Sequence, residues 1–356
     1  MKLKSLLILI AAGLCSNAAL ADFTFANKQG DSLSIDGRFE VRYQNKGNDH
    51  QGEWNSGSSR LGFKGVKQLE NGWAGFGHAE WGYNSGANGS NIYDRILYAG
   101  VQHEKYGKVS AGTKQWSAFY DVAWFTDLGR TFGSRAFGTY NLNDWGIDSG
   151  AGRASNSVVY RNNYQGIKYG FTYQTTREGV KLGNNQTADF DNGLGVSVQY
   201  SPAEGYTLGL AYHQNDMSNF SVGTNLSGDQ TSRIAMLAAN YTGESFYLGT
   251  SINQGSNWEV NSQGQFYDSI GYELYTYYHF ESGFRATLNL NYLADTDDRS
   301  QGYERKTIIP GLEYHFDKNK LVAWAEYQFD LGSDQWDANQ YQNSDDQFAL
   351  GMRYYF

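Results

Sequence analysis

The chain has 356 residues, a formal net charge of −9 at pH 7 and a polar mean hydropathy, yet it contains 28 Tyr, 20 Phe, 9 Trp and 43 Gly. An acidic chain without a basic stripe is a poor binder of nucleic acid, and no stretch beyond the first 21 residues is long and apolar enough for a transmembrane helix. Abundant aromatics in a polar chain are typical of a membrane barrel, in which half of each strand faces lipid and half faces water.

The N-terminal residues predict a secretory signal peptide. Two lysines precede the apolar run 6–14, and an A-x-A cleavage site ends at Ala21. We therefore expect residues 1–21 to be removed and residues 22–356 to form one domain. A lipoprotein processed at Cys15 is the alternative, but a leucine stands before this cysteine, where a small residue is expected. Loss of the single cysteine would leave the mature chain without disulfides.

Sixteen segments of the remaining chain alternate between apolar and polar residues with a period of two. In the first of them, polar Arg38 and Glu40 flank apolar Phe39. Successive side chains of a strand point to opposite faces, so each segment predicts a strand with one apolar and one polar face. The segments are 33–46, 58–69, 73–84, 92–104, 107–115, 154–164, 167–176, 193–201, 205–215, 231–242, 245–254, 269–281, 283–295, 304–316, 320–331 and 345–356.

A soluble β-sandwich shows the same alternation, but these segments are long for soluble strands and suit a tilted bilayer span. Aromatic residues also recur near the segment ends, where they would form the two interfacial girdles of a membrane barrel. They include Tyr43, Trp73, Tyr83, Tyr200, Tyr206, Tyr292 and Tyr314. The pattern therefore favours an all-β transmembrane barrel of sixteen antiparallel strands.

The connections between the segments alternate in length. Short turns join the strands at one end and long loops join them at the other, which is the arrangement of periplasmic turns and extracellular loops in outer-membrane barrels. The third long loop, about 116–153, is the longest. Pro310 lies inside the fourteenth segment, and a closed barrel has no free edge for a residue without an N–H. We therefore expect a bulge or a shifted strand boundary there.

Several short sequences within these segments resemble the trimeric general diffusion porins of Gram-negative bacteria. The resemblance rests on 59–65, 95–101, 106–112 and the final strand 348–356, in that order along the chain. It implies a 16-stranded outer-membrane barrel whose third loop folds inward, and a homotrimer without cofactor that passes small hydrophilic solutes and ions by passive diffusion. It also implies contact with outer-membrane lipids and lipopolysaccharide, and delivery by the barrel-assembly machinery with Phe356 as the assembly signal.

The same resemblance implies the residues of a pore constriction. Segment 125–133 is similar to the family's constriction loop, with Asp127 at an acidic position, but Thr131 stands at the usual Glu position and Arg130 at the usual Pro position. This departure weakens the acidic side of the pore and leaves the usual cation preference open. The matching basic positions on the wall are Arg38, Arg60, Arg95 and Arg153, and Lys114, Glu80 and the loop residue Tyr120 are further pore residues.

Other functions remain as alternatives. The aromatics of the third loop either pack it against the wall or form a stacking track for sugar rings, which would make a saccharide-preferring porin. An outer-membrane hydrolase would need a nucleophile and a base in reach, but the six histidines are scattered and no G-x-S-x-G or H-E-x-x-H motif occurs. Long loops would also suit a phage receptor or an adhesin, and the acidic stretch 295–298 could hold Ca²⁺.

Overall fold

The computed structural model describes residues 23–45, 52–86, 89–133, 148–261, 263–317, 320–333, 337–338, 341–342 and 346–356. The predicted signal peptide lies outside these ranges. Within them, no helix has the length and apolar character needed to cross a membrane.

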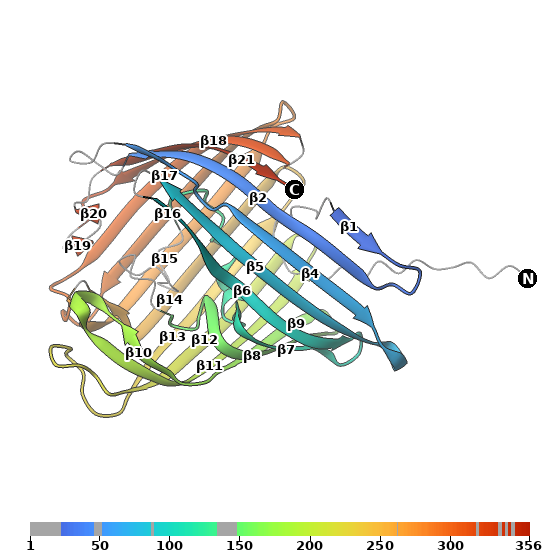
Figure 1. The fold of residues 1–356 in the computed structure, drawn as a ribbon. Helices are drawn as coiled ribbons and strands as arrows, with labels where there is room; N and C mark the ends of the chain where they lie inside the picture. The colour runs from blue at the N-terminus through green and yellow to red at the C-terminus, as the bar shows by residue number, and fades with distance from the viewer. Residues whose placement is uncertain are drawn as a thin grey trace, which may run out of the picture.

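Sixteen long strands form the wall of one closed antiparallel β-barrel (Figure 1), as the sequence predicts. The wall strands are β2 (Ser32–Asn45), β4 (Arg60–Gln68), β5 (Trp73–Gly86), β6 (Gly89–His103), β7 (Gly107–Trp116), β8 (Arg153–Tyr164), β9 (Ile167–Gln174), β11 (Thr187–Ala203), β12 (Tyr206–Ser218), β13 (Gln230–Thr242), β14 (Phe246–Val260), β15 (Phe266–His279), β16 (Phe284–Asp295), β17 (Glu304–Asp317), β18 (Leu321–Asp330) and β21 (Gln347–Tyr355).

Shorter elements extend this wall or lie in its loops. A first short strand and another in the first loop both pair with β2, and a strand in the fourth loop pairs with β11. Two strands of the last loop pair with each other. These elements are β1 (Phe23–Ala26), β3 (Glu53–Asn55), β10 (Arg177–Lys181), β19 (Asp337–Ala338), β20 (Tyr341–Gln342), α1 (Tyr120–Ala123) and the 3₁₀ turns Glu70–Gly72 and Gly183–Asn185.

The first and last strands of the wall close the barrel. Figure 1 shows blue β2 beside red β21, and the two strands pair in antiparallel register, with Glu40 opposite Arg353. The pairing continues to the chain end, where the Gly37 N–H donates to the Phe356 carbonyl at 2.9 Å and the Phe356 N–H donates to the Gly37 carbonyl at 3.2 Å. Within the described residues, each wall strand therefore pairs with a neighbour on both sides, which a β-structure requires in lipid.

The two faces of each strand differ as the alternation predicts. On β2, Phe39 and Val41 point outward and are exposed, whereas Glu40 between them is only 2 % exposed. On β11, Leu194 and Val196 are exposed and Ser197 is buried. An apolar outer face suits lipid, and a polar inner face suits a water-filled lumen.

Strands β11 and β14 are longer than the sequence predicts. Strand β11 begins at Thr187 rather than at 193, and β14 runs to Val260 rather than to 254. Three of the added residues, Ala188, Phe190 and Val260, belong to an apolar cluster at this end of the barrel, and packing within the cluster keeps the two strands extended. Its buried members are Leu182, Ala188, Phe190, Met217, Val260 and Phe266.

The prediction of a bulge or shifted boundary at Pro310 is wrong. Strand β17 runs unbroken through this residue, and Pro310 pairs with Leu288 of β16 in continuous register. On the β18 side the ladder omits Ile309 and Pro310 and resumes at Gly311 without a change of register. The wall therefore tolerates the missing N–H as a local gap in one ladder.

Candidate functional site

The third loop packs against the inside of the barrel wall. It contains helix α1, which contacts β11, β12 and β13. The Tyr247 hydroxyl of β14 donates a hydrogen bond to the Phe125 carbonyl at 2.6 Å. Loop and wall share one buried apolar cluster, which consists of Phe119, Tyr120, Val122, Ala123, Phe125, Ala151, Ala211, Ile234, Met236, Ala238 and Trp258. The contacts of these aromatics favour the packing interpretation over a free stacking track.

A single carboxylate of β18 fixes the distal part of the loop. Glu326 accepts hydrogen bonds from the backbone N–H groups of Arg130 at 2.6 Å, Thr131 at 2.7 Å and Phe132 at 3.1 Å. Glu326 is 7 % exposed, so water competes little for these donors. Hydrogen bonds to an ionised acceptor are roughly twice as strong as neutral ones, and the three together hold this part of the loop against the wall.

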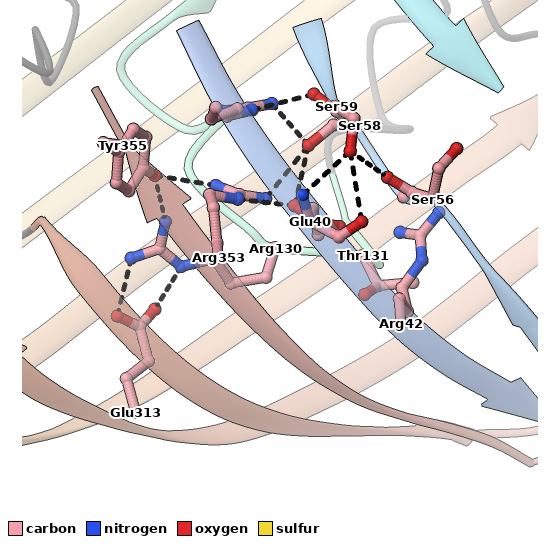
Figure 2. Close-up of polar contacts among 12 residues, drawn as sticks. Glu40, Arg42, Ser56, Ser58, Ser59, Arg130, Thr131, Glu313, Arg353 and Tyr355 are labelled. Atoms are coloured by element: carbon pink, nitrogen blue, oxygen red, sulfur yellow. Dashed lines mark hydrogen bonds and ion pairs between the residues drawn. The ribbon is translucent and has the colours of Figure 1, made fainter. Parts of the chain in front are cut away.

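The guanidinium of Arg130 adds a second attachment (Figure 2). It binds both oxygens of Glu313 on β17, at 2.9 and 2.8 Å, and donates to the Tyr355 hydroxyl of β21 at 2.9 Å. Burial alone would lower the pKa of Arg130, but the Glu313 carboxylate holds that pKa above its ordinary value. The sequence placed Arg130 among the pore residues, and the structure ties its charge to the wall.

Three of the predicted pore residues form one ionic group on β4, β5 and β6. The Glu80 carboxylate binds Arg60 Nε at 3.2 Å through one oxygen and Arg95 Nε at 2.7 Å through the other. Arg38 of β2 lies next to this group, because its register partner on β4 is Arg60. The strand order of the early wall therefore brings these four predicted residues together.

The last strand contributes an arginine that sequence reasoning did not select. Arg353 Nε binds Glu40 at 2.5 Å, and its Nη2 donates to the Ser58 hydroxyl at 3.2 Å (Figure 2). Arg38 donates to the same hydroxyl at 2.5 Å and to the Ser58 carbonyl at 2.9 Å. We call Arg38, Arg60, Arg95 and Arg353 the arginine wall.

Arg153, Tyr120 and Asp127 connect through aromatic rings. The Arg153 guanidinium lies 5.8 Å from the ring centre of Trp116, which stacks on Tyr120 with 4.1 Å between centroids. The Tyr120 hydroxyl donates to Asp127. Lys114 lies near the same end of β7, two residues before Trp116. The base of the loop thus joins a cation of β8 to the loop carboxylate.

Sequence reasoning missed the groups that anchor the loop and close the seam. These groups are Glu40, Ser58, Glu313, Glu326, Arg353 and Tyr355. Alternation alone places the strand residues among them on the inner face. Which loop atom each would meet depends on contacts across most of the chain, so the pattern gave no signal for their roles.

In the acidic stretch 295–298, which could have held Ca²⁺, a neighbouring arginine occupies one of the carboxylates. Arg299 binds Asp268 at 2.6 Å and also binds Asp297. Asp295 accepts the backbone N–H of Ser300 at 2.6 Å. Across the described part of the chain, no group of three or more His, Cys, Asp or Glu side chains is placed to hold a metal ion.

Comparison with known proteins gives matches over the full length. A family model described as Gram-negative porin matches residues 6–356. Outer membrane porin N of Escherichia coli K12 is 26 % identical over 390 residues, and outer membrane protein S2 of Salmonella typhi is 27 % identical over 398; each alignment covers 100 % of both chains.

Solved structures show the same fold. Salmonella typhi OmpF, in a complex with daunomycin, superposes with a TM-score of 0.78 at 21 % identity, covering 94 % of this chain and 100 % of that one. The trimer form of OmpT from Vibrio cholerae superposes with a TM-score of 0.68 at 17 % identity, covering 92 % of this chain and 99 % of that one.

Proposed function

This chain belongs to the Gram-negative porin family, and on that premise we propose that its third loop and its arginine wall form the constriction of the channel. The protein is an outer-membrane porin, through which small hydrophilic solutes and ions diffuse passively. A barrel of sixteen strands is wide enough to leave an aqueous channel, unlike an eight-stranded barrel filled by its own side chains. Passive diffusion needs no energy source and no catalytic group, and we propose no enzymatic activity.

The observation that carries the constriction proposal is the set of bonds from Glu326 to three successive loop N–H groups. A loop that is held against the inside of the wall at residues 130–132 narrows the lumen and gives the channel a constant cross-section. Asp127 on the loop and the cations of the wall would create a transverse field. Polar solutes orient in such a field, whereas apolar solutes must displace ordered water.

The channel is tested by adding purified protein to a planar lipid bilayer in KCl. We expect stepwise, voltage-independent conductance increases at low potential, and closures in groups of three if the protein is a trimer. Adding saccharides tests the alternative of a sugar-preferring pore, since concentration-dependent blocking would favour it. Folded protein that inserts without any conductance would contradict the channel.

Replacing Asp127 with Asn tests whether this loop carboxylate faces the ion path. We expect the ratio of anion to cation permeability to rise roughly twofold to threefold, because one negative charge near the path is lost and salt screens the rest. Reversal potentials in a KCl gradient measure the ratio. The matched control is Asp298→Asn in the loop after β16, which should leave it unchanged. An equal response of both variants would place Asp127 away from the constriction.

We also propose that the protein is a homotrimer that associates through the outer face of β4 to β7. A row of small residues crosses this face and would let neighbouring barrels approach closely there: a Cβ added at Gly65 would meet no atom within 4 Å. Gly65 pairs with Gly77 of β5, which pairs with Ala99 of β6, and Ala99 pairs with Ala111 of β7. The V. cholerae OmpT structure described as a trimer form supports the assembly.

A bulky residue at this face should separate the subunits. Gly65→Trp should shift the protein from trimer to monomer, because an overpacked contact costs about 1–3 kcal/mol and the cost recurs at every interface of the ring. Native gels and light scattering in detergent measure the shift. Ala235→Trp, at an exposed outward position of β13, is the control. Trimers that persist in Gly65→Trp would exclude this face.

The remaining partners are proposals of the same kind. Export would use the signal peptide of residues 1–21, and assembly would use the C-terminal aromatic as recognition signal. The Phe356 ring lies on the outer face against Phe39, with 5.0 Å between centroids, and near Tyr354. A partly exposed aromatic end of this kind suits binding by the barrel-assembly machinery. Outer-membrane lipids and lipopolysaccharide would cover the rest of the apolar belt.

A further inference from the structure

Resting on the channel function proposed above, we infer that the porin favours anionic solutes, with Arg38 as the side chain that most determines this preference. The inference names the solute class of the constriction. It runs against the bulk composition, because a chain with a net charge of −9 would on average attract cations. Ion preference follows the charges beside the path rather than the total charge of the protein.

The four guanidinium groups of the arginine wall outnumber the two carboxylates that bind to this wall. Glu80 is shared by two arginines, Arg60 and Arg95. Glu40 is bound by Arg353. Arg38 donates only to the two neutral oxygens of Ser58, and within the described residues it forms no ion pair. The arginine wall therefore carries a surplus of positive charge.

Arg38 and Arg60 are more accessible than the carboxylates near them, whereas the Arg95 and Glu80 side chains are equally exposed, at 12 % each. The Arg60 side chain is 28 % exposed, against 12 % for the Glu80 side chain that it binds. The Glu40 side chain is 0 % exposed, whereas Arg38 is only partly buried. A passing solute thus meets the guanidinium groups of Arg38 and Arg60 before it meets the carboxylates of Glu40 and Glu80.

The arrangement of the arginines lowers the stability of the sheet. Arg38 lies directly opposite Arg60 on neighbouring strands, and like charges in this position destabilise a sheet. Arg38 and Arg353 also donate to one hydroxyl, that of Ser58, which brings two guanidinium groups close together. An anion in the lumen would relieve the repulsion among all three groups.

The loop does not reverse this balance. Its Arg130 shares Glu313 with Arg285 of β16, which binds the same carboxylate at 2.5 Å, and Glu326 lies at the Arg130 backbone, so two arginines meet two carboxylates and this group adds no net charge. Asp127 is a single carboxylate bound by a tyrosine hydroxyl. Glu40, Glu80 and Asp127 are three carboxylates beside the four arginines of the arginine wall. Lys114 of β7 adds another cation.

The chemistry points to small anions with planar or tetrahedral oxygen groups, such as carboxylates and inorganic phosphate. Guanidinium groups bind such oxygens through paired N–H donors and remain charged at any physiological pH. Arg38 shows Nε and one Nη bound to Ser58, which leaves its other donors available to the lumen. Weak contact of this kind raises local concentration without trapping the solute.

Reversal potentials across a planar bilayer with a KCl gradient test the inference. The unmodified channel should favour Cl⁻ over K⁺, and Arg38→Gln should lower that permeability ratio roughly threefold, the effect of one screened unit charge near the ion path. Arg299→Gln removes the same charge from a surface loop and should leave the ratio unchanged. Replacing KCl with potassium phosphate should retain anion preference.

The possible results separate the inference from the channel function. Open channels whose reversal potential shows K⁺ preference overturn the anion inference and leave the porin function intact. An absence of conductance contradicts the porin function itself. Should Arg38→Gln not assemble, Arg60→Gln replaces it with the same expected direction. Equal responses of the wall and Arg299 variants would remove the arginine wall as the determinant.

Discussion

Replacing Glu326 with Ala is expected to release the distal part of the third loop and enlarge the pore. The variant removes the acceptor of three N–H bonds, those of residues 130–132. Losing even about 3 kcal/mol of such bonding, a modest share of what three bonds to an ionised acceptor contribute, shifts the equilibrium between held and released loop by roughly 100-fold. Single-channel conductance should rise and become noisier.

Solute uptake gives an independent measure of this release. Liposomes that contain the Glu326→Ala channel should admit larger sugars than liposomes with the unmodified channel. Glu326→Gln keeps one acceptor oxygen and should behave between the two. Glu244→Ala, in a short turn between β13 and β14, removes a carboxylate without touching the loop and serves as control. Unchanged conductance and size limit in Glu326→Ala would mean that the apolar cluster and the Arg130–Glu313 pair hold the loop without Glu326.

The second large effect is expected at the seam between β2 and β21. Glu40→Ala leaves Arg353 buried without its carboxylate, and breaking a buried ion pair from one side costs about 3–5 kcal/mol. The Ser58 and Tyr355 oxygens still bind Arg353, so the lower end of this range is expected. Urea unfolding of the barrel in detergent, followed by gel mobility, measures the loss.

Two comparisons give this result its meaning. Glu304→Ala breaks a partly exposed pair with Lys306 and should cost less than about 1 kcal/mol. The double variant Glu40→Ala with Arg353→Met removes both charges and should recover much of the stability, because no unpaired charge remains buried. A Glu40→Ala barrel as stable as the unmodified protein would show that the pair contributes little at the seam.

The wall of the barrel is well predicted by sequence because its physics is local. Every second residue meets lipid, so the alternation at Phe39 and Val41 is enforced along the whole strand. Turns are equally local: Gln165 and Gly166 connect β8 and β9 with φ of 51° and 83°, as a two-residue hairpin requires. Glycine at the second position accepts that conformation without strain.

The loop contacts are not predictable in this way. Arg130 meets Glu313 and Glu326 across separations of 183 and 196 residues, and no periodicity records such a meeting. The extended ends of β11 and β14 were missed for the same reason, since the loops that support them pack only in three dimensions. A closed sheet can accommodate proline at Pro310, because one ladder skips two residues and keeps its register.

The ion pair between Glu40 and Arg353 also favours one register between β2 and β21, the strands that close the barrel. A slip of the last strand by two residues, the smallest that keeps inner and outer faces correct, would set Arg353 opposite Arg38 or Arg42 instead. Either error would place two positive groups side by side in a confined space. In a newly exported chain, the two strands that must meet carry Glu40 and Arg353, which lie 313 positions apart. Only the native register pairs their charges, so we expect barrels closed in a shifted register to reopen.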